Sequence, residues 1–66
     1  MSVYKIIELV GTSQVSWEDA AKQAVKKADQ TLRGLRVAEI TKLDMKLEEG
    51  KFVAYRARVA VSFKYE

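Results

Sequence analysis

The chain has 66 residues and a net charge of +3, and it contains neither cysteine nor histidine. We expect a single domain over residues 1–66, which buries only about 60% of its unfolded surface and so needs reinforcement. Disulfides, thiolate sites, histidine metal ligands and imidazole bases are excluded, which leaves self-association as the route to added stability. No segment has the pattern of a signal peptide or transmembrane helix, so we expect a cytoplasmic protein.

Residues 3–10 (VYKIIELV) predict the first strand, because they are rich in β-branched residues and are followed by a predicted loop at residues 11–13. Apolar side chains occupy both of its faces: Val3, Ile7 and Leu9 on one, and Tyr4, Ile6 and Val10 on the other. One helix can cover only one face of a small sheet. We therefore expect the second face to meet other copies of the chain.

The segment after this loop predicts one helix. Ser16 and Asp19 resemble a capping box, and Gly34 is placed to end the helix with Arg33 in its last turn. The apolar positions between them recur at helical spacing: Ala20, Ala21, Ala24, Val25, Ala28 and Leu32. Because most are alanine, the helix can approach the sheet closely, but each residue contributes little burial. Trp17 is expected to be a packing residue rather than a ligand-stacking one.

Residues 35–65 predict two long strands that are joined at residues 48–51, where Gly50 supplies a positive φ. In the first strand (35–47) the alternation changes phase around Thr41, which predicts a bulge or bend. In the second strand one face is apolar throughout: Val53, Tyr55, Ala57, Val59, Val61, Phe63 and Tyr65. This strand extends for roughly 40 Å, whereas a compact chain of this length has a radius of gyration of about 11 Å. The hairpin must therefore curl strongly or reach into a neighbour.

The order of these elements is β-α-β-β, which predicts an α+β fold. A right-handed crossover makes the first two strands parallel, and the last strand can then lie between them, antiparallel to both.

Side chains suited to catalysis are nearly absent. A general acid or base would have to be a carboxylate, lysine or tyrosine, and no pair of carboxylates is placed to face one cleft. We therefore predict that the protein is not an enzyme. Glu8, Glu39 and Asp44 are strand carboxylates whose copies could converge on an axis of a symmetric assembly, or could be solvated or ion-paired charges.

A basic stripe is the other candidate site. Arg56 and Arg58 share the polar face of the last strand, and Arg36 and Lys42 belong to its neighbour. The aromatic residues of the last strand lie on its opposite face, so the stacking platform of single-strand binders is missing. A small basic nucleic-acid-binding module is therefore only the alternative function, and we do not expect nucleic acid as a partner.

Three blocks of the sequence resemble the dodecins: residues 2–13 (SVYKIIELVGTS), 31–35 (TLRGL) and 55–64 (YRARVAVSFK). The resemblance covers essentially the whole chain. It implies a β-α-β-β protein whose three-stranded antiparallel sheet wraps around one helix, and whose twelve copies form a hollow sphere. Many dodecins bind flavins inside this sphere and store or buffer them. The resemblance therefore implies non-catalytic binding or sequestration of a small ligand by a homododecamer, without a membrane partner.

The flavin signature of the family differs in this chain. Flavin-binding dodecins carry a tryptophan shortly after the helix, where this chain has Val37 after Arg36, and valine cannot stack on an isoalloxazine ring. They also carry a glutamine after a tyrosine or phenylalanine of the last strand, where this chain has Arg56 after Tyr55. Arg36, Val37, Tyr55 and Arg56 are thus the candidate cofactor-binding positions, for FMN or riboflavin.

Four other segments look more like the calcium dodecin branch of the family: residues 16–18 (SWE), 36–39 (RVAE), 44–45 (DM) and 61–64 (VSFK). This branch is described as binding calcium. The resemblance thus implies calcium or a flavin as the ligand. It assigns no calcium ligands to particular residues, so Glu8, Glu39 and Asp44, singled out above as strand carboxylates, are the candidate metal ligands.

Overall fold

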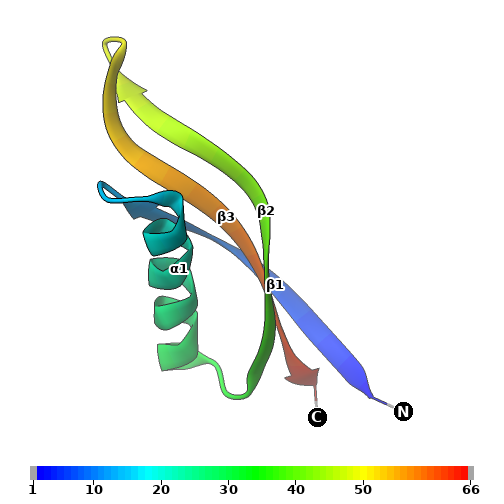
Figure 1. Ribbon diagram of the computed structural model, residues 1–66. Coiled ribbons are helices and arrows are strands. Elements are labelled where there is room, and N and C mark those ends of the chain that lie inside the picture. The colour runs from blue at the N-terminus through cyan, green and yellow to red at the C-terminus, as the bar shows by residue number, and fades with distance from the viewer. Residues whose placement is uncertain (1, 66) are drawn as a thin grey trace.

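The computed structural model describes residues 2–65. Its elements in chain order are β1 (Val3–Ser13), α1 (Trp17–Thr31), β2 (Leu35–Glu48) and β3 (Lys51–Tyr65). The strands form one sheet in the order β1-β3-β2, and β3 is antiparallel to both neighbours. α1 lies against one face of this sheet (Figure 1). The α+β fold, the β-α-β-β order and the central place of the last strand are confirmed.

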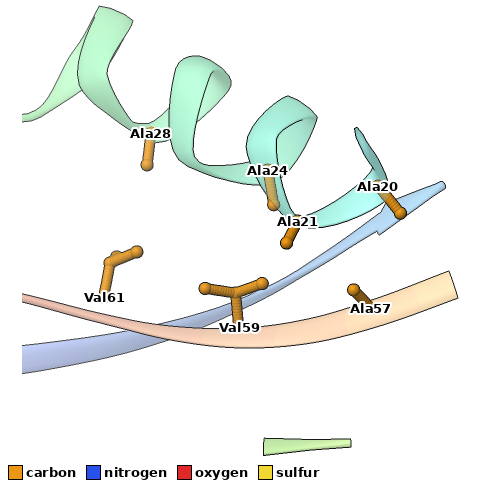
Figure 2. Packing of buried hydrophobic residues seen from close by; sticks show 7 residues of the cluster. All are labelled: Ala20, Ala21, Ala24, Ala28, Ala57, Val59 and Val61. Carbon is orange, nitrogen blue, oxygen red and sulfur yellow. The ribbon is translucent and has the colours of Figure 1, made fainter. Parts of the chain in front are cut away.

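The buried core lies between α1 and the central strand, and its helical side consists of alanines. Figure 2 shows these alanines pointing toward three residues of β3. The seven residues of this cluster are each at most 8% exposed: Ala20, Ala21, Ala24, Ala28, Ala57, Val59 and Val61. The central parts of the predicted apolar faces of the helix and of the last strand are thus buried. Val53, Tyr55 and Phe63 are half-buried, and Ala54, which alternates with them, is buried as well. The side chain of Tyr65 lies outside the described residues.

The predicted start of α1 is confirmed, but its predicted end is not. The Ser16 hydroxyl accepts a hydrogen bond of 3.0 Å from the backbone N–H of Asp19, which confirms the predicted N-cap. The predicted C-terminus is wrong, because α1 ends at Thr31 and has no basic residue in its last turn. Leu32 is extended and partly buried against the core, so the chain leaves the helix before Gly34, whose φ of 70° turns it into β2.

β1 continues through residues 11–13, so the predicted loop at these positions is wrong. Gly11 pairs with Ala57 inside the sheet and is buried. A Cβ atom on Gly11 would overlap the carbonyl oxygen of Ala20 and lie 3.1 Å from the Cβ of Ala24. Gly11 therefore lets the strand pass directly beneath the helix backbone. Glycine is typical of loops, but within a strand it often marks such a close approach of another backbone.

The hairpin of β2 and β3 makes the chain elongated. The radius of gyration is 13.4 Å and the extents are 49 × 19 × 15 Å, against about 11 Å for the radius of a compact chain of this length. In Figure 1 the hairpin curves away past the first turn of α1. The expectation that the hairpin outgrows the body of its own domain is confirmed.

Local features of the hairpin explain its curve. The pairing of β2 with β3 shifts between Ile40 and Lys42, which confirms the irregularity predicted at Thr41; two further shifts, near each end of β2, were not predicted. Such bulges bend a strand and increase its twist. At the turn, Glu49 (φ 52°) and Gly50 (φ 75°) both adopt a positive φ, as a tight two-residue hairpin loop requires.

Within residues 2–65, no helix has the length and apolar character needed to cross a membrane.

Candidate functional site

The sheet face opposite α1 carries the three carboxylates that the sequence singled out. Directly paired residues share a face, and Ala60 pairs with both Glu8 and Glu39. The backbones of these glutamates are thus two strand spacings apart, or roughly 10 Å. Asp44 pairs with Arg56, four residues from Ala60 along β3, or roughly 13 Å away. One chain therefore does not bring the three together, and residues 2–65 contain no cluster of three potential metal ligands.

Asp44 and Arg56 form a bidentate ion pair on this face. Arg56 donates from Nε to Oδ1 at 2.7 Å and from Nη2 to Oδ2 at 3.1 Å, which is the fork geometry that arginine and carboxylate groups prefer. The hydrogen bond from Arg56 lowers the pKa of Asp44, partial desolvation opposes this, and the charges of Arg56 and nearby cations add to it. The same hydrogen bond raises the pKa of Arg56. The carboxylate of Asp44 is therefore already engaged.

The second arginine of the predicted basic stripe also has an acidic neighbour. Arg58 Nε lies 3.9 Å from Glu8 Oε1, and both side chains remain substantially exposed to solvent. Arg56 and Arg58 are thus each close to a carboxylate, while Arg36 lies at the far end of β2. The stripe is not continuous, and this arrangement does not favour the nucleic-acid alternative.

Trp17 fastens the first turn of α1 to the hairpin. Its indole N–H donates a 3.0 Å hydrogen bond to the backbone carbonyl of Asp44. Its ring meets the ring of Tyr55 edge-on, with centroids 4.8 Å apart, and Tyr55 lies at the same distance from Phe52. The packing role predicted for Trp17 is confirmed. Tyr55, a candidate cofactor residue, is part of this aromatic cluster.

The four candidate cofactor positions fall into two separate groups. Arg36 and Val37 lie at the start of β2, where Val37 pairs with Ser62 and is 61% exposed. Tyr55 and Arg56 lie six or seven residues away along β3, a distance of roughly 20 Å or more. A site that used both groups would have to combine residues from two copies of the chain.

The sequence did not predict how much of β2 the helix leaves uncovered. Four apolar residues of β2, which we name the β2 stripe, are each about half exposed: Ile40, Leu43, Met45 and Leu47. The partners of Ile40, Leu43 and Met45 in the register lie on the face of β3 that packs against α1, and Leu47 pairs with Phe52 beyond a register shift. A groove of 360 Å³ separates Ala21 and Val25 of α1 from Ala38 and Ile40 of β2. The alternation of Leu43, Met45 and Leu47 indicated a shared face, but not that α1 stops short of it.

The chain is similar in sequence and fold to known proteins. A family model described as Dodecin matches residues 3–66. The chain is 44% identical over 64 residues to calcium dodecin of Mycobacterium tuberculosis, covering 97% of this chain and 90% of that protein. It is 36% identical to a dodecin of Thermus thermophilus, over 97% of this chain and 93% of that one.

Two crystal structures show the same architecture. The crystal structure of the M. tuberculosis calcium dodecin, described as a calcium-chelating antigen with a novel calcium-binding site, has a TM-score of 0.85 at 44% identity. It matches 98% of this chain and 93% of its own. A T. thermophilus protein has a TM-score of 0.89 at 35% identity, over 100% of this chain and 97% of that one.

Proposed function

The chain belongs to the dodecin family, and on that premise we propose that it is a non-catalytic protein that assembles as a hollow homododecamer and sequesters a small ligand. Calcium and a flavin are the two candidate ligands. The observation that carries the proposal is the β2 stripe, a row of four half-exposed apolar residues on an elongated hairpin. Exposed apolar rows of this kind mark surfaces that other chains cover.

The small core supports assembly from identical copies. Val59 and Val61 are the largest fully buried side chains in the described part of the chain, and the helical side of the core is alanine. Small side chains bury little apolar area each, so this core contributes little of the free energy that a short chain needs. Packing of the β2 stripe against neighbours would add the missing burial.

The polar side chains support binding rather than catalysis. The sequence has no histidine or cysteine, and in residues 2–65 no buried polar side-chain atom lacks a hydrogen-bond partner. The pKa shifts of Asp44 and Arg56 arise from their contact with each other. Enzymes usually hold an acid or base in an environment that poises its pKa for proton transfer, and this pair offers none.

Calcium is the better supported of the two ligands. Carboxylate oxygens are the ligands that calcium prefers, and it takes six to eight of them. Glu8 and Glu39 flank Ala60 on one face, so copies meeting on an axis would multiply these groups. A flavin fits the residues less well, because Val37 offers no ring to stack on and Arg56 is bound to Asp44.

Assembly is tested by light scattering at physiological salt. We expect the full chain to form the dodecamer, and Leu43→Glu, within the β2 stripe, to yield smaller species because it places a charge in a buried contact. Lys46→Glu, on the same strand but outside the stripe, is the control and should assemble. A wild-type monomer or dimer would overturn the assembly proposal.

The ligand is tested on the same preparation. We expect calcium to raise the melting temperature and a chelator to lower it, because a ligand that binds only the folded state stabilises it. Glu39→Gln should abolish the response to calcium, whereas Glu49→Gln, in the exposed hairpin turn, should preserve it. Quenching of added riboflavin fluorescence together with no response to calcium would instead identify a flavin binder.

A further inference from the structure

The groove between α1 and β2 has an apolar lining and a charged rim. The rim consists of Lys22, Lys26 and Asp29 of α1, and all three are exposed. They follow one another at intervals of four and three residues, so they lie along one side of the helix. The rest of the lining is apolar: Ala21, Val25, Ala38, Ile40 and Val59. The groove thus offers apolar surface bordered by two positive charges and then one negative charge.

This groove is continuous with the β2 stripe. Ile40 lines the groove and is also the first residue of the stripe. The helix of the same chain already forms one wall of the groove, and the hairpin of that chain curves away past the first turn of α1 (Figure 1). A neighbouring copy that covers the stripe therefore also reaches the groove, and the segment that it presents there fills the groove.

The far end of the hairpin carries apolar side chains that its own helix leaves uncovered. Residues 47–52, which we name the hairpin tip, begin with Leu47 and end with Phe52. These two residues pair directly and so share one face of the sheet, and they are 56% and 47% exposed. The ring of Phe52 lies 4.8 Å from that of Tyr55, which in turn contacts Trp17 of α1. The apolar pair is therefore on the α1 side of the sheet.

The charges of the hairpin tip are opposite to those of the groove. Glu48 and Glu49 are negative, Lys51 is positive, and all three are exposed. Lys46 Nζ lies 3.9 Å from Glu48 Oε1, but both side chains are more than half exposed. Such a surface pair contributes little, so Glu48 can turn toward another cation. The tip thus offers two negative charges and one positive charge to a rim that has two positive charges and one negative charge.

We infer that the hairpin tip of one copy occupies the groove between α1 and β2 of the next copy. The apolar pair of the tip lies on the apolar lining, its two glutamates contact the rim lysines, and its lysine contacts Asp29. Because tip and groove are different surfaces, the contact is heterologous: each copy inserts one tip and receives another, and such contacts close into rings where the rotation allows. This inference rests on the proposed function, because it names the contact through which copies assemble.

The sequence contains no cysteine, so disulfide trapping tests the contact directly. We expect oxidation of the assembled Lys22→Cys/Glu49→Cys chain to give covalent species larger than the dimer on non-reducing gels, because each chain is then linked through both its groove and its tip. Lys27→Cys/Glu49→Cys is the matched control, since Lys27 is exposed on α1 but outside the groove. It should give no such species.

The rival occupant of the groove is the turn between β1 and α1, where Val15 is 78% exposed. Lys22→Cys/Val15→Cys tests this turn under the same oxidation. Large covalent species from this pair, with none from Lys22→Cys/Glu49→Cys, would overturn the inference in favour of the turn. Equal trapping of the Lys22 and Lys27 variants with Glu49→Cys would also overturn it, because the groove would then have no preference for the tip.

Charge reversal tests the ionic part of the contact, with light scattering along a dilution series to find the concentration at which assemblies dissociate. Lys22→Glu/Lys26→Glu should raise this concentration about tenfold or more, because two attractions become repulsions. Glu48→Lys/Glu49→Lys should have the same effect. The chain that combines all four substitutions should dissociate near the wild-type concentration, because opposite charges again face each other.

Lys27→Glu/Lys42→Glu is the control for charge reversal, since it changes the net charge as much at exposed positions outside tip and groove. It should assemble as the wild type does. Double reversals that assemble normally, or a fourfold variant that keeps its helix by circular dichroism but does not recover, would overturn the inference and leave the proposed assembly standing. A wild-type chain that stays monomeric would overturn the proposed function and the inference together.

Discussion

The close approach of β1 and α1 makes Gly11→Ala the most informative single substitution. Gly11 is buried at the point where the strand passes beneath the helix. An added Cβ would overlap the carbonyl oxygen of Ala20, and it would lie 3.0 Å from the carbonyl carbon of that residue and 3.1 Å from the Cβ of Ala24. Two of these atoms belong to helix backbone, which cannot rotate away as a side chain can, so α1 as a whole must withdraw from the sheet.

The cost follows from what the withdrawal separates. The alanines of α1 pack directly on Val59 and Val61, and a gap of 0.5–1 Å loses roughly a quarter to a half of the dispersion energy of such contacts. Overpacking a core costs about 1–3 kcal/mol, and more where the backbone is the obstacle. We expect a loss of about 3 kcal/mol, which lowers the melting temperature of a domain this small by roughly 12–24 °C.

Thermal melts followed by circular dichroism at fixed protein concentration measure this loss, since assembly makes stability depend on concentration. Gly50→Ala is the control. Gly50 has a φ of 75° but nothing within 4 Å of an added Cβ, so its cost is the backbone strain alone, about 1–2 kcal/mol. If Gly11→Ala melts at or above the temperature of Gly50→Ala, the steric explanation of Gly11 is refuted.

Three further predictions concern the contacts that fix the helix and the sheet. Ser16→Ala should lower the free energy of unfolding in urea by about 1 kcal/mol, because the N-cap is lost. An unchanged free energy of unfolding would mean that water accepts the hydrogen bond of the Asp19 N–H equally well. Trp17→Phe should cost about 1–2 kcal/mol, since the hydrogen bond to the carbonyl of Asp44 is lost while an aromatic contact remains; an unchanged urea midpoint would contradict this. The pKa of Asp44 is lowered in the folded chain, so its pair with Arg56 contributes fully above the ordinary pKa of 3.8, and that contribution is lost as the pH falls through the folded value. In Arg56→Gln, an NMR titration should show the pKa of Asp44 rising, and an unchanged value would deny Arg56 this role.

The sequence predicted the fold because local and long-range signals agreed. The serine cap, the alanine stripe and the alternation along β3 each indicate one structure, and the β-α-β-β order leaves few topologies. The errors lie at glycines. We predicted a loop at Gly11 because glycine is typical of loops. The actual reason for glycine at this position is that α1 crosses directly above it, a tertiary contact that the sequence pattern does not show. Gly34 does turn the chain, but the helix had already ended, since Leu32 packs into the core.

The candidate sites were harder to predict because they depend on partners across the sheet. Nothing in the spacing of Asp44 and Arg56 shows that they are directly paired; that follows from the register, which shifts by one residue between Lys46 and Leu47. Without that shift, Asp44 would lie opposite Tyr55, on the other face of β3. The pairing of β2 with β3 likewise brings Lys64 to a pocket that Arg33 and Arg36 line. Sequence patterns identify the faces of single strands more readily than neighbours across several strands.

Because α1 covers only part of the sheet, the buried core is small while the hairpin of β2 and β3 extends beyond it. The core joins α1 to β3 and to Ile7 and Leu9 of β1, and the β2 stripe projects beyond it. In residues 2–65 no second helix lies over that stripe, which is why we propose that another copy covers it. Substitutions in the stripe, such as Leu43→Glu, should therefore release subunits that retain their helix, whereas Gly11→Ala weakens the subunit itself. Light scattering and circular dichroism along one urea titration would show whether the assembly dissociates before or after the helix is lost. Loss of helix before dissociation in Leu43→Glu would contradict this division between core and assembly surface.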